Sequence, residues 1–523
     1  MLRNFWGWGD AGAALDTATL EGLGKLLAVR FPGWTPDLVR APAESEVSLR
    51  SPRVRPPASL AHLVSDDALD RAGHAYGKAL RDVVRALRRS WPAPPDLVVR
   101  PTSALEVAAV LDWCAGAGIA CVPYGGGSSV VGGVETACGS DGGVVSLDLG
   151  RLDRILEVDA VSQAARIEAG ILGPALEDGL RPHGLTIRHF PQSFEFSTLG
   201  GWIATRAGGH FATGPTHIDD FVESITMQTP AGEIETRRLP ASGAGPSPDR
   251  LLLGSEGAFG VITSAWMRVL PRPTHRASGV VTFDSFEVGA RACRAILQSG
   301  ARPSNCRLLD PDEALLAGAG PGAHAVLLLA YESAHVPVDD MLAVAVEVAC
   351  DHGGTATPGP ATGRDKAADS WRSSFMRMPY MRDGLARLGA ITETFETAIT
   401  WDRFDEFVAG IRAAIHAVLE ETCGAGTVTC RLTHVYPDGA APYFTVVAPS
   451  TLADQLEQWD TVKAAASEAI VAGGATITHH HAVGRVHGDA YRRQVPALHL
   501  EALRAVKGRL DPAGVMNPGV LVP

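Results

Sequence analysis

Three consecutive histidines, His479, His480 and His481, form the most compact group of titratable side chains in the sequence. Imidazole exists in neutral and charged forms near pH 7, so this group could take up and release protons during a reaction. On an extended chain neighbouring side chains point to opposite faces, which predicts that the three do not share one target. A solvated polar loop and a metal site are the alternatives. No nearby cysteine or carboxylate completes a known ligand spacing, so we predict no metal.

A second segment with chemical potential is the glycine-rich loop that follows the apolar run 119–122. Its glycines let backbone N–H groups approach an anion and its serines add hydroxyl donors, so the loop could hold a pyrophosphate. The spacing matches neither the GxGxxG nor the GxxxxGK[ST] phosphate-binding motif, and a plain surface turn is the alternative. The residues expected to contact the pyrophosphate are Pro123, Tyr124, Gly125, Gly126, Gly127, Ser128 and Ser129.

Two later segments, 190–209 and 254–263, again combine small residues, hydroxyls and glycines. In this order the three segments resemble the FAD-binding (PCMH-type) domain of the vanillyl-alcohol-oxidase type of flavoproteins, and most closely the alkyldihydroxyacetonephosphate synthase family. The resemblance implies bound FAD, which we expect to be noncovalent because the glycine-rich loop has no histidine or cysteine. It implies further cofactor contacts from Gln192, Ser193, Thr198, Gly201, Thr205, Arg206, Ala207, Gly208, Glu256, Gly257, Gly260, Val261 and Ile262.

The same resemblance assigns catalytic roles. It makes Tyr443 the acid/base, with His480 and His481 supporting proton transfer, and a lowered tyrosine pKa would require nearby positive charge. Arg382 would hold an anionic group through its planar guanidinium. An ordinary core tyrosine and a salt bridge of Arg382 to Asp383 or Glu393 are the alternatives. The residues implied to contact substrate are Arg382, Thr394 and His479.

One departure from the family concerns the substrate. Gln192 stands where the family has an aspartate, so a charged acceptor becomes a neutral amide. The leading interpretation is the family's reaction in ether-lipid synthesis, exchange of the acyl group of acyl-dihydroxyacetone phosphate for a fatty alcohol. The alternative is FAD-dependent oxidation of a 2-hydroxy acid or another alcohol, as an oxidase or dehydrogenase.

Composition limits the partners. The chain has 523 residues and a net charge of −12, with no basic tract that would indicate a nucleic-acid partner. Eight scattered cysteines fit reduced thiols, no apolar run reaches membrane-spanning length, and no targeting segment is evident at 1–10 or 521–523. We therefore expect a cytoplasmic protein that acts on a small-molecule or lipid substrate. Peripheral membrane contact and a homodimer stay open.

The elements that must position these residues predict an α+β fold. It combines a two-subdomain FAD-binding domain of the vanillyl-alcohol-oxidase type with an α+β cap domain that has an antiparallel sheet. We expect residues 1–60 to be irregular and residues 63–90 to be helical, with an apolar face that includes Leu80 and Val84. The expected domains are an N-terminal extension at 1–92, the FAD-binding domain at 93–273, the substrate (cap) domain at 274–490, and a C-terminal segment at 491–523 that returns to the FAD domain.

Overall fold

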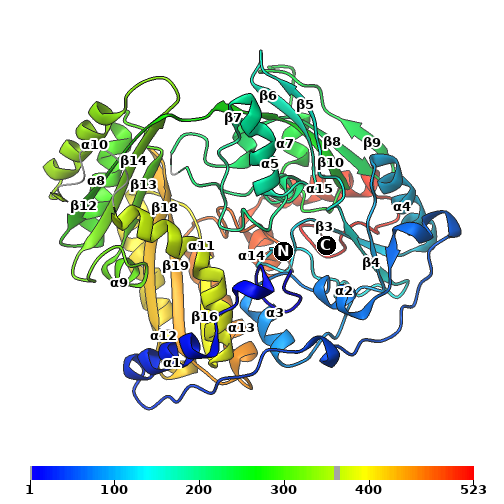
Figure 1. Ribbon diagram of the computed structural model, residues 1–523, viewed down its shortest axis with the longest axis horizontal. Coiled ribbons are helices and arrows are strands. Elements are labelled where there is room, and N and C mark those ends of the chain that lie inside the picture. Colours follow the sequence, from blue (N-terminus) through cyan, green and yellow to red (C-terminus); the bar gives the residue numbers. More distant parts are fainter. Residues whose placement is uncertain (1–2, 212, 358–365, 523) are drawn as a thin grey trace.

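The computed structural model describes residues 3–211, 213–357 and 366–522. Two lobes lie side by side in Figure 1. We call them the first lobe, built mainly from residues 93–271, and the cap lobe, built mainly from residues 275–472.

The first lobe contains two main sheets, and β7 and β11 form a short antiparallel pair of their own. The first sheet has the order β1-β2-β4-β3, with β2, β4 and β3 parallel, and the second is antiparallel with the order β5-β6-β10-β8-β9. Each sheet has its own apolar core. The strands are β1 (Val64–Ser65), β2 (Leu97–Val99), β3 (Ala120–Tyr124), β4 (Val144–Asp148), β5 (Ile155–Asp159), β6 (Ala164–Glu168), β7 (Leu185–Thr186), β8 (Val222–Thr229), β9 (Gly232–Glu235), β10 (Val261–Arg268) and β11 (Leu270–Pro271). The helices are α4 (Ala104–Ala117), α5 (Gly173–Leu180), α6 (Leu199–Thr205) and α7 (Pro248–Leu252).

The cap lobe is one antiparallel sheet with helices on both faces. Its order is β15-β12-β14-β13-β18-β19-β16, with β17 paired to β19. Helices α8, α10, α12 and α13 share the large apolar core with one face of the sheet. Helices α9 and α11 also contact strands of the sheet. The strands are β12 (His275–Phe283), β13 (Asn305–Leu309), β14 (Ala325–Ser333), β15 (Thr355–Thr357), β16 (Ala390–Glu396), β17 (Ile399–Thr400), β18 (Thr427–Val435) and β19 (Gly439–Pro449). The helices are α8 (Phe286–Gln298), α9 (Pro311–Leu316), α10 (Asp339–Asp351), α11 (Lys366–Arg387), α12 (Phe404–Cys423) and α13 (Gln455–Ala472).

Strand periodicity decides which cap side chains reach the site. Leu432 and Phe444 belong to the helix-covered core. Arg431 and Tyr443 precede them by one residue, on neighbouring strands and paired with each other, so they project from the opposite face. The same sheet therefore builds a core with one face and a polar site with the other.

Both ends of the chain pack into the lobes. The expectation that residues 1–60 are irregular is wrong for α1 (Thr17–Arg30), which Asp16 caps through its side chain. In the expected helical stretch 63–90, the chain forms α2 (Ala68–Gly73) and α3 (Leu80–Leu87), and the apolar face of α3 joins the cap core. The last helices are α14 (Gly488–Gln494) and α15 (Ala497–Leu510). After α15 the backbone of Met516 bridges to Cys121 on β3.

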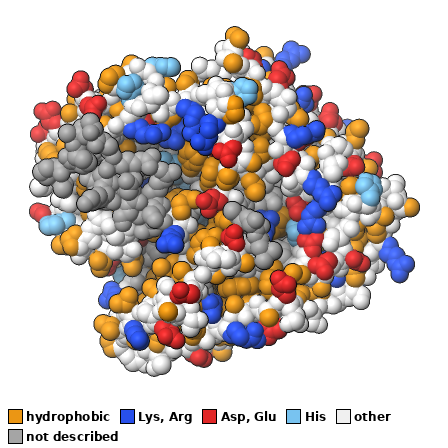
Figure 2. Space-filling view, in the orientation of Figure 1, with side chains coloured by type: hydrophobic (Ala, Val, Ile, Leu, Met, Phe, Trp, Pro, Cys, Tyr) orange, Lys and Arg blue, Asp and Glu red, His pale blue; other side chains and the backbone are white. Residues whose placement is uncertain are grey.

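The α+β fold with an antiparallel cap sheet is confirmed. The change of sheet falls between β11 and β12, at residues 271–275, and the domain boundaries themselves stay a prediction. None of the described helices is long and apolar enough to cross a membrane. On the face drawn in Figure 2, basic and acidic side chains are interspersed.

We expect Asp511→Ala to loosen the return of the chain to the first lobe. The buried Asp511 carboxylate pairs with Lys507 at 2.6 Å and accepts hydrogen bonds from the N–H groups of Val515 at 3.1 Å and Met516 at 2.8 Å. Removing a buried partner of this kind costs about 3 kcal/mol, so the thermal midpoint should fall by several degrees in calorimetry. Asp489→Ala, at a carboxylate that is 93 % exposed, is the control and should change little. Equal midpoints for the two variants would contradict the expectation.

Candidate functional site: a glycine cradle beside a histidine cluster

The predicted pyrophosphate loop packs closely against the two later glycine-containing segments. A Cβ placed on Gly126 would lie 1.9 Å from the carbonyl oxygen of Phe196. A Cβ on Gly257 would lie 2.9 Å from the ring of Pro123. Only glycine fits such approaches, so the three segments form one cradle lined by backbone groups, which suits a pyrophosphate.

Side chains around the cradle fix its shape. Thr198 caps α6 by accepting a hydrogen bond from the N–H of Gly201 at 3.3 Å, and Ser193 donates to Ser197 at 3.0 Å. Ser129 accepts from the N–H of Gly133 at 3.0 Å. The remaining predicted cofactor residues lie in the strands, helix and turns of this region: Tyr124, Gly125, Gly127, Ser128, Thr205, Ala207, Gly260, Val261 and Ile262.

Three predicted cofactor residues make other contacts. Gln192 donates to the carbonyl oxygen of Phe375 on α11 at 2.8 Å. Arg206 pairs with Asp219 at 2.7 Å. The buried Glu256 accepts from two backbone N–H groups of residues 483–484, just beyond the histidines, and burial raises its pKa to about 7.

The segment after α6 brings the cradle to the histidines of the cap. A Cβ on Gly208 would lie 3.0 Å from the Cβ of His480 and 3.2 Å from Cε1 of His434. Gly208 also forms a backbone bridge with His217. The predicted cofactor site and the predicted catalytic histidines are therefore in direct contact.

Tyr443 lies among charged and aromatic groups on this face. The guanidinium carbon of Arg431 is 3.8 Å from the centre of its ring, His480 stacks at 6.1 Å and His481 lies edge-on at 5.6 Å. The Thr394 side chain on β16 acts on the Tyr443 hydroxyl and favours its ionised form. Burial raises the pKa of Tyr443, and the Arg431 charge opposes this only in part. The expectation of a lowered pKa is therefore wrong, because the loss of water outweighs the cation.

The three histidines wrap around one buried carboxylate. Glu396 accepts hydrogen bonds from the backbone N–H groups of His479, His480 and His481 at 2.6, 3.1 and 2.9 Å, and from the Thr478 hydroxyl at 2.6 Å. The chain bends here, so the alternating arrangement of an extended strand does not apply. His480 and His481 both point toward Glu396 and Tyr443.

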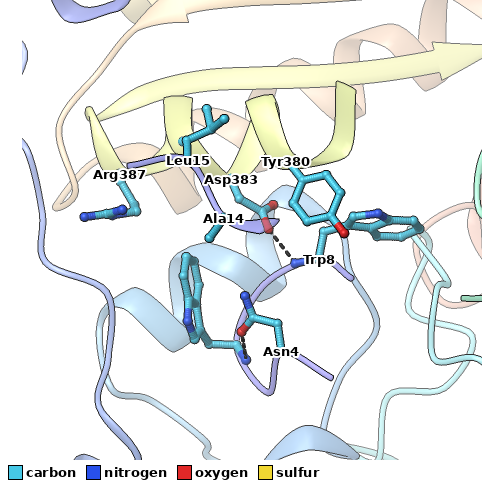
Figure 3. A pocket seen from close by; sticks show the side chains of 9 residues that line it. Asn4, Trp8, Ala14, Leu15, Tyr380, Asp383 and Arg387 are labelled. Carbon is cyan, nitrogen blue, oxygen red and sulfur yellow. Dashed lines mark hydrogen bonds between the residues drawn. The ribbon is translucent and has the colours of Figure 1, made fainter. Parts of the chain in front are cut away.

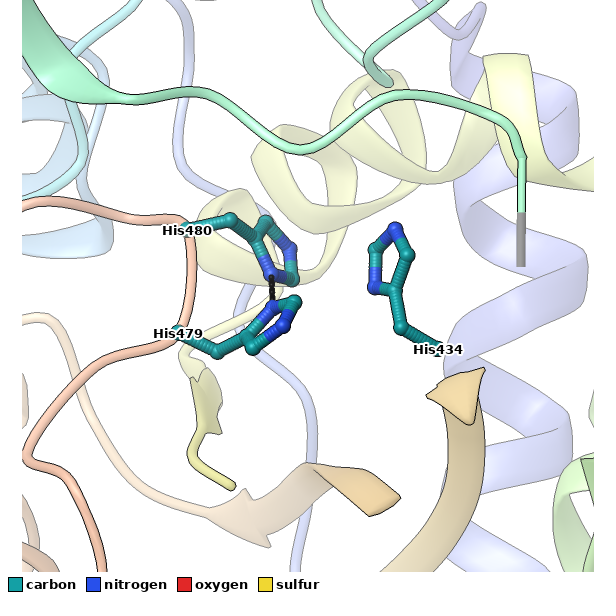
Figure 4. A group of neighbouring side chains, drawn as sticks. All are labelled: His434, His479 and His480. Carbon is teal, nitrogen blue, oxygen red and sulfur yellow. Dashed lines mark hydrogen bonds between the residues drawn. The ribbon is translucent and has the colours of Figure 1, made fainter. Parts of the chain in front are cut away.

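His479 faces a further polar group that the sequence did not single out. Its Nε2 lies 2.6 Å from the Tyr436 hydroxyl and 3.1 Å from Nε2 of His217. Figure 4 shows His434, from the end of β18, facing His479 and His480. The spacing of His434 and Tyr436, at and just after the end of β18, could have indicated these two residues from the sequence. No local pattern in the sequence indicates His217 or Glu396.

Burial determines the charges of the cluster. It lowers the pKa of His480 to about 3 and those of His434 and His479 well below the ordinary value, and it lowers the pKa of His481. Although burial opposes the charge of Glu396, the hydrogen-bond donors around it, which include the Thr478 hydroxyl, hold its pKa well below the usual range. At neutral pH the cluster thus combines one carboxylate with uncharged imidazoles.

Arg382 lies in a different setting. Its guanidinium pairs with Asp383 at 2.7 Å and donates to the carbonyl oxygen of Lys78. Asp383 in turn accepts from the N–H of Trp8, in the small pocket drawn in Figure 3. Among the described contacts none joins Arg382 to Tyr443 or the histidines, and the internal salt bridge named as its alternative is present. A role toward substrate stays a prediction.

A cavity of about 450 Å³ opens beside the histidines. Its walls include His217, His479 and His480, the predicted cofactor residues Thr205, Arg206 and Glu256, and apolar side chains such as Phe259 and Leu503. Ligand atoms of His434, His479 and His480, and of Glu396, His480 and His481, lie within 4.8 Å of one another, close enough to hold a cation. The metal-free interpretation therefore stays a prediction.

Comparison with known proteins agrees with this geometry. Residues 95–237 match the family described as FAD binding domain, and residues 272–521 match FAD linked oxidases, C-terminal domain. The chain thus contains an FAD binding domain followed by the C-terminal domain of FAD linked oxidases, and its cofactor is FAD. The backbone cradle of glycines fits that cofactor.

Individual proteins of known name are similar to this chain over most of its length. The chain is 29% identical to alkyldihydroxyacetonephosphate synthase of Caenorhabditis elegans, over 88% of this chain and 81% of the relative. It is 24% identical to a glycolate oxidase subunit of Bacillus subtilis, over 82% of this chain and 89% of that protein. Its fold matches a solved alkyldihydroxyacetonephosphate synthase with a TM-score of 0.81 at 24% identity over 98% of both chains. p-Cresol methylhydroxylase matches with a TM-score of 0.69 at 14% identity, over 89% of this chain and 95% of that chain.

Replacing Gly126 by valine should abolish FAD retention, because a branched side chain would collide with the Phe196 carbonyl. The purified variant should lack the flavin absorbance that the parent protein shows. Gly116→Val is the matched control, since a Cβ there meets nothing within 4 Å, and it should keep its flavin.

Acid precipitation of the parent should release the chromophore into solution if the cofactor is noncovalent. Full flavin content in Gly126→Val, or flavin in the acid pellet, would contradict these assignments.

Proposed function

We propose that this flavoprotein catalyses an alkyldihydroxyacetonephosphate synthase-like reaction, in which a fatty alcohol replaces the acyl group of acyl-dihydroxyacetone phosphate. One observation carries the proposal: buried Tyr443 and half-buried His480 and His481 form one acid/base group, and His480 lies against Gly208 of the cofactor cradle. The similarity to the synthase relatives over most of the chain supports it.

The charges on these groups assign their roles. Bound FAD supplies an electron-accepting ring that can react with the substrate carbon. His480 and His481 are neutral and can accept a proton, whereas Tyr443, with its raised pKa, keeps its hydroxyl proton and can donate it to the departing carboxylate. Arg431 lies over the Tyr443 ring and pairs with the buried Glu313, which holds the tyrosine in place. Thr394 orients the hydroxyl, and Arg382 would bind the anionic end of the substrate.

Oxidation of a 2-hydroxy acid or another alcohol is the second candidate. Gln192 favours this oxidation, because its amide donates a hydrogen bond to the carbonyl oxygen of Phe375 and brings no negative charge to the site. The likeness to a glycolate oxidase subunit supports it as well. In that reaction a neutral histidine would remove the hydroxyl proton.

The proposal extends to where the enzyme acts and to its oligomeric state. A cytoplasmic location, peripheral contact with a membrane and a homodimer would fit a protein that takes a lipid substrate from a bilayer surface. The synthase relatives support the lipid substrate, and sedimentation with lipid vesicles tests the contact.

Anaerobic mixing of the holoprotein with candidate substrates separates the two reactions. Acyl-dihydroxyacetone phosphate and a long-chain alcohol should give an ether product, with the flavin spectrum oxidised at the end. Lasting bleaching by a 2-hydroxy acid, without ether formation from the other pair, would favour the oxidation instead.

Tyr443→Phe should keep normal FAD content while turnover falls about 100-fold, the scale for losing a positioned acid. Steady-state turnover and flavin absorbance measure the two quantities. Tyr331→Phe is the matched control, since its hydroxyl is buried in the same cap sheet without a hydrogen-bond partner among the described residues. Normal turnover of Tyr443→Phe with full FAD would remove Tyr443 from the mechanism.

A further inference from the structure

We propose that His217, His479 and His480 form a proton relay of fixed polarity, in which Nε2 of His480 accepts the proton and His217 receives the charge. The inference rests on the proposed function, because both candidate reactions need a proton acceptor at this place. It adds His217, from the first lobe, to a cluster otherwise built by the cap.

A backbone carbonyl group fixes the tautomer of His217, at one end of the relay. Nδ1 of His217 lies 3.0 Å from the carbonyl oxygen of Arg206. A carbonyl oxygen can only accept, so Nδ1 carries the hydrogen, and in the neutral ring Nε2 is left with a lone pair. The bridge between His217 and Gly208 holds this ring beside the cofactor cradle.

The lone pair on Nε2 of His217 fixes the tautomer of His479, in the middle of the relay. Nε2 of His217 lies 3.1 Å from Nε2 of His479, so His479 must carry its hydrogen at Nε2. The Tyr436 oxygen, 2.6 Å from the same nitrogen, can share this hydrogen and donate its own to Thr216, whose hydroxyl is 3.2 Å away. Nδ1 of His479 then has the lone pair.

The carboxylate of Glu396 fixes the tautomer of His480, at the other end of the relay, in the same sense. Nδ1 of His480 lies 3.1 Å from Nδ1 of His479 and 3.4 Å from the carboxylate of Glu396. Both neighbours are acceptors, so His480 carries its hydrogen at Nδ1, and its Nε2 lone pair is available to the site. The opposite polarity would set the Nε2 lone pairs of His217 and His479 against each other and turn a lone pair of His480 toward Glu396.

Each proton transfer along the relay breaks one N–H bond and forms another. When Nε2 of His480 takes a proton, its Nδ1 hydrogen passes to Nδ1 of His479, and the Nε2 hydrogen of His479 passes to Nε2 of His217. The positive charge moves from the ring of His480, in contact with buried Glu396, to the ring of His217, and both rings are half-buried and border the cavity. There, water can remove the proton.

Nitrogen NMR of the FAD-loaded protein tests the polarity without any turnover. Long-range 1H–15N spectra of protein labelled at its 17 histidines distinguish the two neutral tautomers, and single His→Gln variants assign the signals. We expect the Nδ1–H form for His217 and His480 and the Nε2–H form for His479. An Nε2–H form of His480, or an Nδ1–H form of His479, would overturn the relay even if the synthase reaction is demonstrated.

His217→Gln tests the transfer itself. The amide oxygen can still accept from His479 but cannot pass a proton on, so kcat should fall about 10-fold with KM and FAD content unchanged. Proton washout from the acylated carbon of deuterated substrate into water should slow by the same factor. His183→Gln, at an exposed histidine, is the matched control and should leave all four quantities unchanged. Normal washout in His217→Gln would overturn the exit through His217.

Discussion

The buried carboxylate of Glu396 is the interaction on which the site depends. It takes up three consecutive backbone N–H groups and the Thr478 hydroxyl, and this bends the chain so that His480 and His481 reach Tyr443 together. An ionised carboxylate is stable in the interior only with donors of this number. The histidine turn and the end of β16 therefore stabilise each other, and neither would keep its geometry alone.

A second buried carboxylate connects this turn to the other lobe. Glu256, in the third glycine-containing segment, accepts from the N–H groups of Val483 and Gly484, and Asn517 donates to the Glu256 carbonyl oxygen at 2.7 Å. The loop that carries the histidines is thus held at its start by the cap and at its end by the first lobe. Close contact between Gly208 and His480 follows from this double attachment.

Burial of the site also reverses the expected direction of the Tyr443 pKa shift. Arg431 lies against the Tyr443 ring, but desolvation raises the pKa of the tyrosine, and it lowers the pKa values of the histidines. The resting site therefore has a protonated tyrosine and neutral imidazoles. In the proposed reaction the histidines would accept protons and Tyr443 would donate one.

The sequence by itself determined the features that depend on local backbone chemistry. The cofactor, the α+β class and the likeness to the synthase family follow from glycine segments such as Gly125–Gly127, whose absent side chains leave a signature in the sequence. It did not reveal α1, nor the bend at His479–His481. Only the tertiary structure brought Glu396 and His217 to His479, from 83 and 262 residues away, and His434 to Gly209, from 225 residues away. The direction of each pKa shift was also decided there, because burial depends on packing between distant segments and has no local pattern in the chain.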